Sequence, residues 1–172
     1  MNSALSKAEP GPGGIEFHDA ESAAGIAKAR ELFLEYAQSL GFSLCFQGFD
    51  EELAGLPGKY ARPDGRLLLV EIDGQVAGCV ALRPLDSATC EMKRLFVRPA
   101  FRGKRLGRVL AERIIVEARA IGYTHMRLDT VASTMADAVA LYRRLGFVEI
   151  CPYCPNPMPD ALYMELDLKH LE

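Results

Sequence analysis

Residues 90–110 read CEMKRLFVRPAFRGKRLGRVL, and this stretch decides the fold. Its first part, Cys90 to Val97, is an apolar, strand-like run. An amphipathic helix is predicted from Leu106 to Ile121, because apolar residues recur there every four positions. Another strand-like run follows from His125 to Val131. A strand, a helix and a second strand in this order predict a parallel strand pair joined by a crossover helix.

The turn between this strand and this helix is rich in positive charge. Free backbone N–H groups and the positive end of the helix dipole meet at a helix start, which makes an anion site. Gly103 and Gly107 would let the backbone approach a phosphate closely, although the spacing matches neither a Walker loop nor a dinucleotide-binding glycine motif. The segment predicts a phosphate-bearing ligand, with a solvated basic loop as the alternative. Its basic residues are Lys93, Arg94, Arg98, Arg102, Lys104, Arg105 and Arg108.

The rest of the chain supplies the further strands and helices of an α/β protein. Apolar periodicity predicts a helix from Glu21 to Leu40, and Thr134 with Asp137 forms a capping pair that predicts the start of another helix. Asp73-Gly74 is a hairpin signal, whereas residues 42–61 are predicted to be irregular. The remaining strand-like runs are Ile15–His18, Leu67–Ile72, Gln75–Leu82, Phe147–Ile150 and Leu162–Leu168.

Length and composition favour one domain. The chain has 172 residues, enough for a single sizeable core. Residues 1–14 are rich in Gly, Pro, Ala and Ser and are predicted to be a disordered tail, which leaves residues 15–172 as the domain. The net charge of −3 argues against a general nucleic-acid binder. No apolar run reaches the roughly 18 residues that span a bilayer, and the N-terminus does not resemble a signal peptide, so we expect no membrane partner and a cytoplasmic location.

The five cysteines do not predict a metal site. Cys79 and Cys90 lie in apolar, strand-like runs and are expected to be small core residues. Cys151 and Cys154 form a lone Cys-x-x-Cys pair in a proline-rich segment, whereas a structural zinc ion needs about four ligands. We therefore expect ordinary loop cysteines and no metal.

Two ordered motifs resemble the signature of the GNAT superfamily of N-acetyltransferases. The first, R/Q-x-x-G-x-G/A, stands here at residues 102–107 as RGKRLG, and the second, A-x-x-L-Y-x-x-L-G-F, is unbroken from Ala138 to Phe147. The resemblance covers about residues 15–168 and implies a mixed α/β fold with a twisted sheet of about six or seven strands and about four helices. The chain departs from the pattern at Arg105, which takes the first glycine position, and at Met135, where many members carry Asn.

The resemblance implies a binding site for acetyl-CoA. In this family the strand before the signature pairs its backbone with the pantetheine arm, and the matching residues here are Leu95, Phe96 and Val97. The signature turn would hold the diphosphate. Its residues in this chain are Arg102, Gly103, Lys104, Arg105, Leu106, Gly107 and Arg108.

Two side chains are candidates for catalysis. Family members often use the tyrosine of the second motif, here Tyr142, to protonate the departing thiolate; a core tyrosine is the alternative. Glu91 stands at an offset that resembles the base of the histone-acetylating branch; a strand-edge carboxylate paired with Lys93 or an arginine is the alternative. A base is useful because a lysine-like amine, with a pKa of about 10.4, is almost fully protonated at neutral pH. Asp129, near the end of the next strand, could orient the amine.

The sequence thus predicts an N-acetyltransferase that moves the acetyl group from acetyl-CoA to a primary amine by direct attack in a ternary complex. One alternative is a catalytically weak acyl-CoA-binding or sensing module, and a second is a nucleic-acid-binding protein that uses residues 93–108. Residues 42–62 and 152–159 are expected to wall the acceptor site. The acceptor stays open between a small amine, an amino acid, an antibiotic and a protein lysine, and a homodimer is expected because family members are often dimers.

Overall fold

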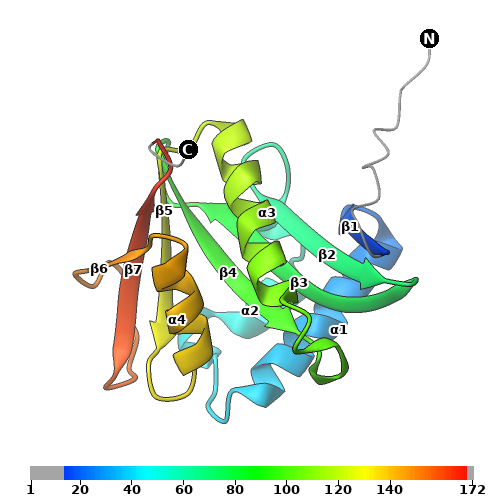
Figure 1. Ribbon diagram of the computed structural model, residues 1–172, viewed down its shortest axis with the longest axis horizontal. Coiled ribbons are helices and arrows are strands. Elements are labelled where there is room, and N and C mark those ends of the chain that lie inside the picture. The colour runs from blue at the N-terminus through cyan, green and yellow to red at the C-terminus, as the bar shows by residue number, and fades with distance from the viewer. Residues whose placement is uncertain (1–13, 170–172) are drawn as a thin grey trace.

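The fold is a seven-stranded mixed sheet with helices on both faces, as the computed structural model in Figure 1 shows. The structure describes residues 14–169, so the predicted disordered tail lies outside the described residues except for Gly14. The strand order is β1-β2-β3-β4-β5-β7-β6, and only β4 and β5 pair in parallel. The predicted α/β class and the predicted parallel pair are confirmed.

The predicted strands and helices follow one another in the predicted order, and the structure adds a short α-helix and 3-10 helices. The strands are β1 (Ile15–Asp19), β2 (Arg66–Ile72), β3 (Gln75–Pro84), β4 (Thr89–Val97), β5 (His125–Val131), β6 (Val148–Ile150) and β7 (Ala161–Asp167). The α-helices are α1 (Ala23–Ser39), α2 (Phe49–Ala54), α3 (Leu106–Ile121) and α4 (Ala136–Arg144), and the 3-10 helices are η1 (Cys45–Gln47), η2 (Gly58–Tyr60) and η3 (Pro99–Phe101). Within residues 14–169, no helix combines the length and the apolar character that crossing a membrane requires.

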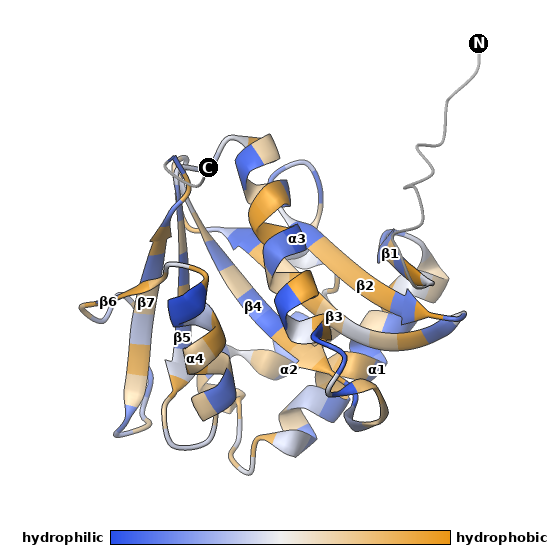
Figure 2. Ribbon diagram, viewed as in Figure 1, coloured by the Kyte–Doolittle hydropathy of each residue, from blue (hydrophilic) through white to orange (hydrophobic). Residues whose placement is uncertain are grey.

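The sheet is buried on both faces. In Figure 1, α3 and α4 lie in front of the sheet and α1 and α2 lie behind it. Along β2, Leu68 and Val70 belong to the hydrophobic cluster beneath α3, whereas Leu67 and Leu69 belong to the cluster beneath α1. Because side chains alternate between the faces of a strand, a strand covered on both sides is apolar throughout. Figure 2 shows this as a largely orange β2.

The helix α3 has the predicted bounds, Leu106 and Ile121. Its four-residue apolar repeat is fully buried, with Leu110 and Ile114 both 0% exposed. The helix ends where Gly122 adopts φ 111°, a left-handed conformation that suits glycine. A helix anchored this firmly holds its N-terminal turn at a fixed place beside β4.

Two local predictions are wrong. Residues 42–61 are not irregular, since they contain η1, α2 and η2; six residues of α2 are too few for an apolar period to be visible. Thr134 and Asp137 do not cap α4, which begins at Ala136 with Met135 as its N-cap and no side-chain capping bond. The Met135 N–H instead donates to the carbonyl of Val131, so the chain turns into α4 directly from the end of β5.

The two central strands meet at one end and separate toward the other. The pairing of β4 with β5 is confined to Thr89–Glu91 and His125–Arg127. Beyond these residues β5 continues to pair with β7, and β4 with β3. One edge of β4 therefore lacks a neighbouring strand from residue 92 onward, which opens a V-shaped gap in the middle of the sheet.

A β-bulge lies in the part of β4 that does not pair with β5. Phe96 pairs with Cys79 and Lys93 pairs with Ala81, so two residues of β4 stand opposite one residue of β3. Arg94 lies in the bulge with φ 59°, which is uncommon for a residue with a side chain. Gly78 accommodates the close approach, because a Cβ there would overlap the carbonyl oxygen of Phe96.

Candidate active site

The turn before α3 has the geometry of an anion site. Gly103 has φ 82°, and Arg105 has φ 59° as the N-cap residue of α3. No side chain within residues 14–169 caps this helix start, so its first N–H groups are available to a ligand. The position that departs from the GNAT pattern does require a positive φ, and Arg105 adopts it.

The seven basic residues of the segment divide into three groups. Lys93 and Arg94 are 9% and 4% exposed and lie inside the protein. Arg98 forms ion pairs with Glu31 and Glu35 of α1, at 2.9 and 2.7 Å. The prediction of one phosphate-binding cluster of seven residues is therefore wrong. Lys93 and Arg94 lie in the gap between β4 and β5, and Arg98 is ion-paired with α1. The residues that remain exposed on the turn are Arg102, Lys104, Arg105 and Arg108.

Three of the exposed cations of the turn have local partners in the part of the chain that the structure describes. The Arg102 Nε donates to the Val97 carbonyl at 3.3 Å, and the Arg108 Nε donates to Glu112 at 2.7 Å. Lys104 lies over the Phe101 ring. The Leu106 side chain is buried in the core, so this residue can meet a ligand only through its backbone.

The predicted pantetheine-binding strand is the edge that the gap leaves unpaired. Phe96 is buried beneath α1, and its ring contacts the Tyr36 ring with centroids 6.0 Å apart. Leu95 and Val97 pack against the cluster beneath α3. Their side chains thus belong to the core on both faces, while their backbone borders the gap.

A polar pocket occupies the gap between β4 and β5. Its walls come from α1, η1, the bulged part of β4, the end of β5, the N-cap of α4 and α4 itself. The lining residues are Tyr36, Gln47, Met92, Lys93, Arg94, Leu95, Leu128, Asp129, Thr130, Met135 and Tyr142. Tyr142 is thereby placed together with the predicted pantetheine edge and with Asp129, whereas Glu91 lies one position before the gap opens.

Tyr142 lies on the buried face of α4. It is 7% exposed, and its ring contacts Phe147 with centroids 5.7 Å apart. Burial raises the pKa of its phenol well above the ordinary value, and the nearby Tyr36 and Asp129 raise it further. The phenol therefore stays protonated at neutral pH and can act as a proton donor.

Glu91 is buried and fully engaged. It is 1% exposed, and its Oε1 accepts from the Arg83 Nε at 2.8 Å while its Oε2 accepts from the Tyr153 hydroxyl at 2.6 Å. The Lys93 ammonium lies 3.7 Å from Oε1. Burial raises the pKa of Glu91, but Lys93, Arg83 and the Tyr153 hydroxyl together hold it below its ordinary value. The carboxylate is therefore ionised, and it reaches a substrate only through water or after Tyr153 moves.

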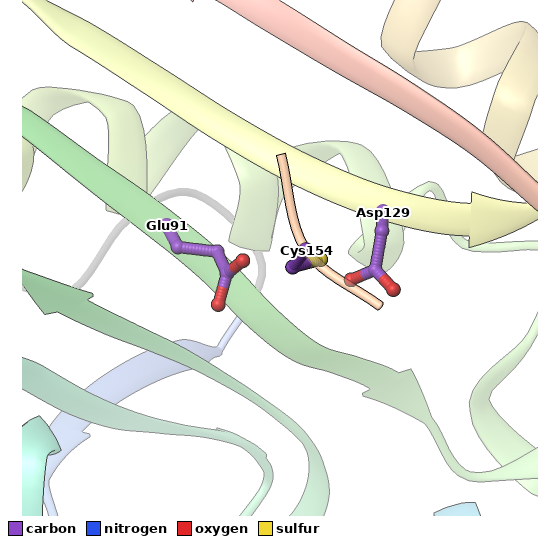
Figure 3. Close-up of side chains that lie close together, drawn as sticks. All are labelled: Glu91, Asp129 and Cys154. Atoms are coloured by element: carbon purple, nitrogen blue, oxygen red, sulfur yellow. The ribbon is translucent and has the colours of Figure 1, made fainter. Parts of the chain in front are cut away.

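Asp129 faces Glu91 across the gap, as Figure 3 shows with Cys154 between them. One potential ligand atom from each of these three side chains lies within 4.8 Å of the others. The Lys93 ammonium lies 3.7 Å from Glu91 and 3.9 Å from Asp129, so it forms an ion pair with each of the two carboxylates. Burial raises the pKa of the Cys154 thiol to about 11, which keeps it protonated. A protonated thiol is a poor metal ligand, since the thiolate is the form that binds a metal ion.

Sequence reasoning missed the residues that distant segments bring to this pocket. Tyr36 comes from α1, and Gln47 from η1. Asn156, in the proline-rich loop after β6, donates to Asp129 at 3.0 Å, and Tyr153 in the same loop reaches Glu91. The expectation that residues 42–62 and 152–159 lie beside the acceptor site pointed toward Gln47, Tyr153 and Asn156, but nothing pointed toward Tyr36.

Comparisons with known proteins agree with this architecture. The profile of the acetyltransferase (GNAT) family matches residues 27–147. An uncharacterised N-acetyltransferase of Schizosaccharomyces pombe is 43% identical over 139 residues, covering 80% of this chain and 85% of the relative. An IAA acetyltransferase of Azospirillum brasilense is 42% identical over 110 residues, covering 63% of this chain and 71% of the relative.

A solved structure has the same fold. It is a GNAT family acetyltransferase from Elizabethkingia anophelis with acetyl-CoA bound, and it matches with a TM-score of 0.66 at 21% identity over 90% of this chain and 98% of its own. The family profile covers more than half of the chain, and the yeast relative extends over most of it. The chain belongs to the acetyltransferase (GNAT) family and is an acyltransferase.

Proposed function

We propose that this protein transfers the acetyl group of acetyl-CoA to a primary amine by direct attack in a ternary complex. The observation that carries the proposal is the continuity of three features: the uncapped, cationic start of α3, the unpaired edge of β4 and the pocket that contains Tyr142. Together they form one path along the gap between β4 and β5. The Elizabethkingia anophelis acetyltransferase, which has the same fold, was solved with acetyl-CoA bound, and this supports the proposal.

The residues of the turn fit a diphosphate. The first N–H groups of α3, the open backbone at Gly103 and the exposed cations Arg102, Lys104 and Arg105 supply donors and positive charge. From there the pantetheine arm would follow the backbone of Leu95–Val97 into the pocket. A backbone N–H aimed at the thioester oxygen would stabilise the charge that develops there, and such a donor contributes about 3 kcal/mol to lowering a barrier.

The chemical step needs one acid and one base. The amine nitrogen attacks the thioester carbonyl carbon, a C–N bond forms, and the C–S bond breaks. Tyr142 gives its phenolic proton to the departing thiolate, a role that the raised pKa of this phenol supports because it stays protonated until then. The surplus proton of the amine leaves through water to Glu91, the proposed base. Because ion pairs hold the pKa of Glu91 low, this carboxylate is a weak base. A water that contacts both Glu91 and Asp129 would help it to accept the proton.

The test is turnover by a Tyr142→Phe variant, measured as release of free CoA with a panel of amine acceptors. The variant should lose about 10²- to 10⁴-fold in kcat while its Kd for acetyl-CoA, measured by calorimetry, stays within a factor of two or so. Tyr123→Phe is the matched control, because Tyr123 is also 7% exposed but lies outside the pocket. Wild-type turnover in Tyr142→Phe would remove this tyrosine from the mechanism.

The same titration tests the larger proposal. A wild-type protein that binds no CoA species at millimolar concentration would overturn the proposed function. Binding without turnover of any amine would favour the acyl-CoA-binding module instead. The homodimer and the cytoplasmic location stay predictions.

A further inference from the structure

Arg94 presents an unpaired donor beside the pocket. The residue is 4% exposed, and its Nε and Nη1 donate to Glu52 and Gln47, both at 2.9 Å. Its Nη2 is buried and, among residues 14–169, has no hydrogen-bond partner of standard geometry. A buried guanidinium nitrogen without an acceptor is costly, and native proteins rarely leave one unless a ligand or water completes it. The bulge that places Arg94 here also holds it at φ 59°, the kind of local strain found at functional sites.

Tyr36 lies beside the Arg94 guanidinium. The guanidinium carbon of Arg94 is 5.9 Å from the centroid of the Tyr36 ring, and both residues line the pocket. Burial raises the pKa of Tyr36, although the adjacent Arg94 opposes the shift. The phenol therefore remains a donor at neutral pH. A charged donor and a neutral donor side by side suit an anionic oxygen, above all a carboxylate.

A negatively charged group, the Asp129 carboxylate, lies on the other side of Gln47. Asp129 Oδ2 accepts from Asn156 at 3.0 Å and from Gln47 at 3.4 Å, whereas the Lys93 ammonium lies 3.9 Å from Oδ1, beyond hydrogen-bond distance. Among residues 14–169, Asp129 Oδ1 accepts no hydrogen bond, so beside its ion pair with Lys93 it can accept one from an incoming ammonium group. The side-chain amide of Gln47 connects the two ends, since it donates to Asp129 and accepts from Arg94.

The distance between the two ends is informative. Asp129 and Arg94 are separated by no more than one amide group and two hydrogen bonds. An α-amino acid spans a comparable width, because a single carbon joins its ammonium to its carboxylate. We propose that the acceptor is a free α-amino acid, with its carboxylate bound by Arg94 Nη2 and the Tyr36 hydroxyl and its amino group directed to Asp129. This inference rests on the proposed acetyl transfer and names the acceptor class of that same pocket.

Acceptors without a carboxylate satisfy only one end of the pocket. An alkylamine or a lysine side chain brings the ammonium for Asp129 but leaves Arg94 Nη2 without an anion. An α-amino amide brings a neutral carbonyl oxygen in place of the carboxylate, with the same shape. The comparison of an amino acid with its own amide therefore isolates the charge that Arg94 is proposed to recognise.

The test is acetyl transfer to the twenty proteinogenic α-amino acids and to the matching α-amino amides, followed as free CoA release. At least one acid should exceed its amide by about 10- to 100-fold in kcat/KM, the range expected for a hydrogen bond to a charged group. Arg94→Gln should remove this preference, because it should lower kcat/KM for the acid much more than kcat/KM for the amide. Tyr36→Phe should reduce the preference by a smaller factor and keeps the ring that packs on Phe96.

Controls separate recognition from folding and from the failure of catalysis. Arg66→Gln removes another buried, ion-paired arginine that does not line the pocket, and it should leave the acid-to-amide ratio unchanged. If amides or simple amines are the better acceptors, the amino acid inference falls while the acetyltransferase proposal stands. If nothing in the panel is acetylated, calorimetry of each acid and amide on the CoA-saturated protein decides, and equal binding of the two overturns the inference.

Discussion

The two ends of the gap between β4 and β5 handle charge in opposite ways. At the turn before α3, four cations are exposed, and the partners that they have within residues 14–169 are local. At the pocket end, Glu91, Lys93 and Arg94 are buried, Asp129 is half-buried, and all four are linked to one another or to neighbouring side chains. One segment of chain supplies both ends, because Lys93 and Arg94 lie only eight residues or so before the turn.

The difference corresponds to the ligands proposed for each end. A diphosphate carries its own charge and is met by backbone N–H groups that the helix start leaves free. The turn can therefore stay open to solvent. An acceptor amine must be oriented and deprotonated within a closed space, which requires fixed charges. Buried charges are costly unless they are paired, so the pocket contains both signs.

The largest effect is expected from breaking the buried network at Glu91. Glu91→Gln keeps the shape of the side chain but removes the carboxylate that pairs with Arg83 and leaves Lys93 with Asp129 alone. Removing one partner of a buried ion pair costs about 3 to 5 kcal/mol of unfolding free energy. Chemical denaturation measures the loss. Glu165→Gln is the control, since the Glu165–Arg127 pair is partly exposed and should contribute at most about 1 kcal/mol; equal losses would contradict the distinction.

The effect of Glu91 should depend on pH. Its folded-state pKa is lowered, so the stabilisation is complete above the ordinary glutamate pKa of about 4.3 and is lost as the pH falls through the folded-state value. The stability difference between wild type and Glu91→Gln should therefore be constant at neutral pH and shrink in acid. Denaturation series at several pH values test this, and a difference that grows in acid would contradict the assigned direction.

The next largest effect is expected at the bulge that connects the two ends. In Gly78→Ala the new Cβ would overlap the Phe96 carbonyl oxygen and lie 3.3 Å from the Val97 Cα. These are backbone atoms, so β4 must shift, at a cost of about 1 to 3 kcal/mol. The shift also moves the edge proposed to bind pantetheine, so the Kd for acetyl-CoA should rise. Gly41→Ala meets no atom within 4 Å, and its positive φ should cost about 1 kcal/mol without changing this Kd.

The sequence was informative wherever the physical cause is local. The helix α3 was predicted to the residue, because its apolar repeat is regular and Gly122 ends it. The hairpin at Asp73-Gly74 was equally readable, since both residues adopt the positive φ that this pair favours. The helix α2 was missed because six residues are too few to show an apolar period. The capping pair predicted at Thr134 does not form, because the chain turns into α4 directly after β5.

The site was readable at one end only. The glycine and basic residues of the exposed turn predict an anion site, and both are local signals in the sequence. The bulge does not, because nothing near Arg94 in sequence indicates that a bulky residue takes φ 59° there. Tyr36 and Gln47 reach the pocket only through tertiary packing, and they come from segments about 50 residues before β4. Partners that depend on long-range contacts leave no pattern in the local sequence.

Salt should separate the two ends by a smaller effect. The turn is exposed, so its attraction for a diphosphate is screened, and the Kd for acetyl-CoA should rise several-fold between about 0.05 and about 0.5 M KCl. The buried ion pairs are screened much less, so the stability deficit of Glu91→Gln should change little over the same range. Calorimetry and denaturation at matched ionic strengths measure both, and a Kd that is insensitive to salt would contradict a role for the exposed cations.

The smallest effect is expected at Arg105, where conformation and charge can be separated. Arg105→Gly removes roughly 1 kcal/mol of backbone strain, because glycine adopts the left-handed conformation without a steric penalty. The greater freedom of glycine in the unfolded chain offsets part of this gain. Arg105→Ala removes the same charge but keeps the strain. Both variants should weaken acetyl-CoA binding equally, by a few-fold, since each removes one cation at a helix N-terminus. Only the glycine variant should unfold at a higher temperature than wild type; if the alanine variant binds acetyl-CoA much more weakly than the glycine variant, backbone geometry rather than charge governs this position.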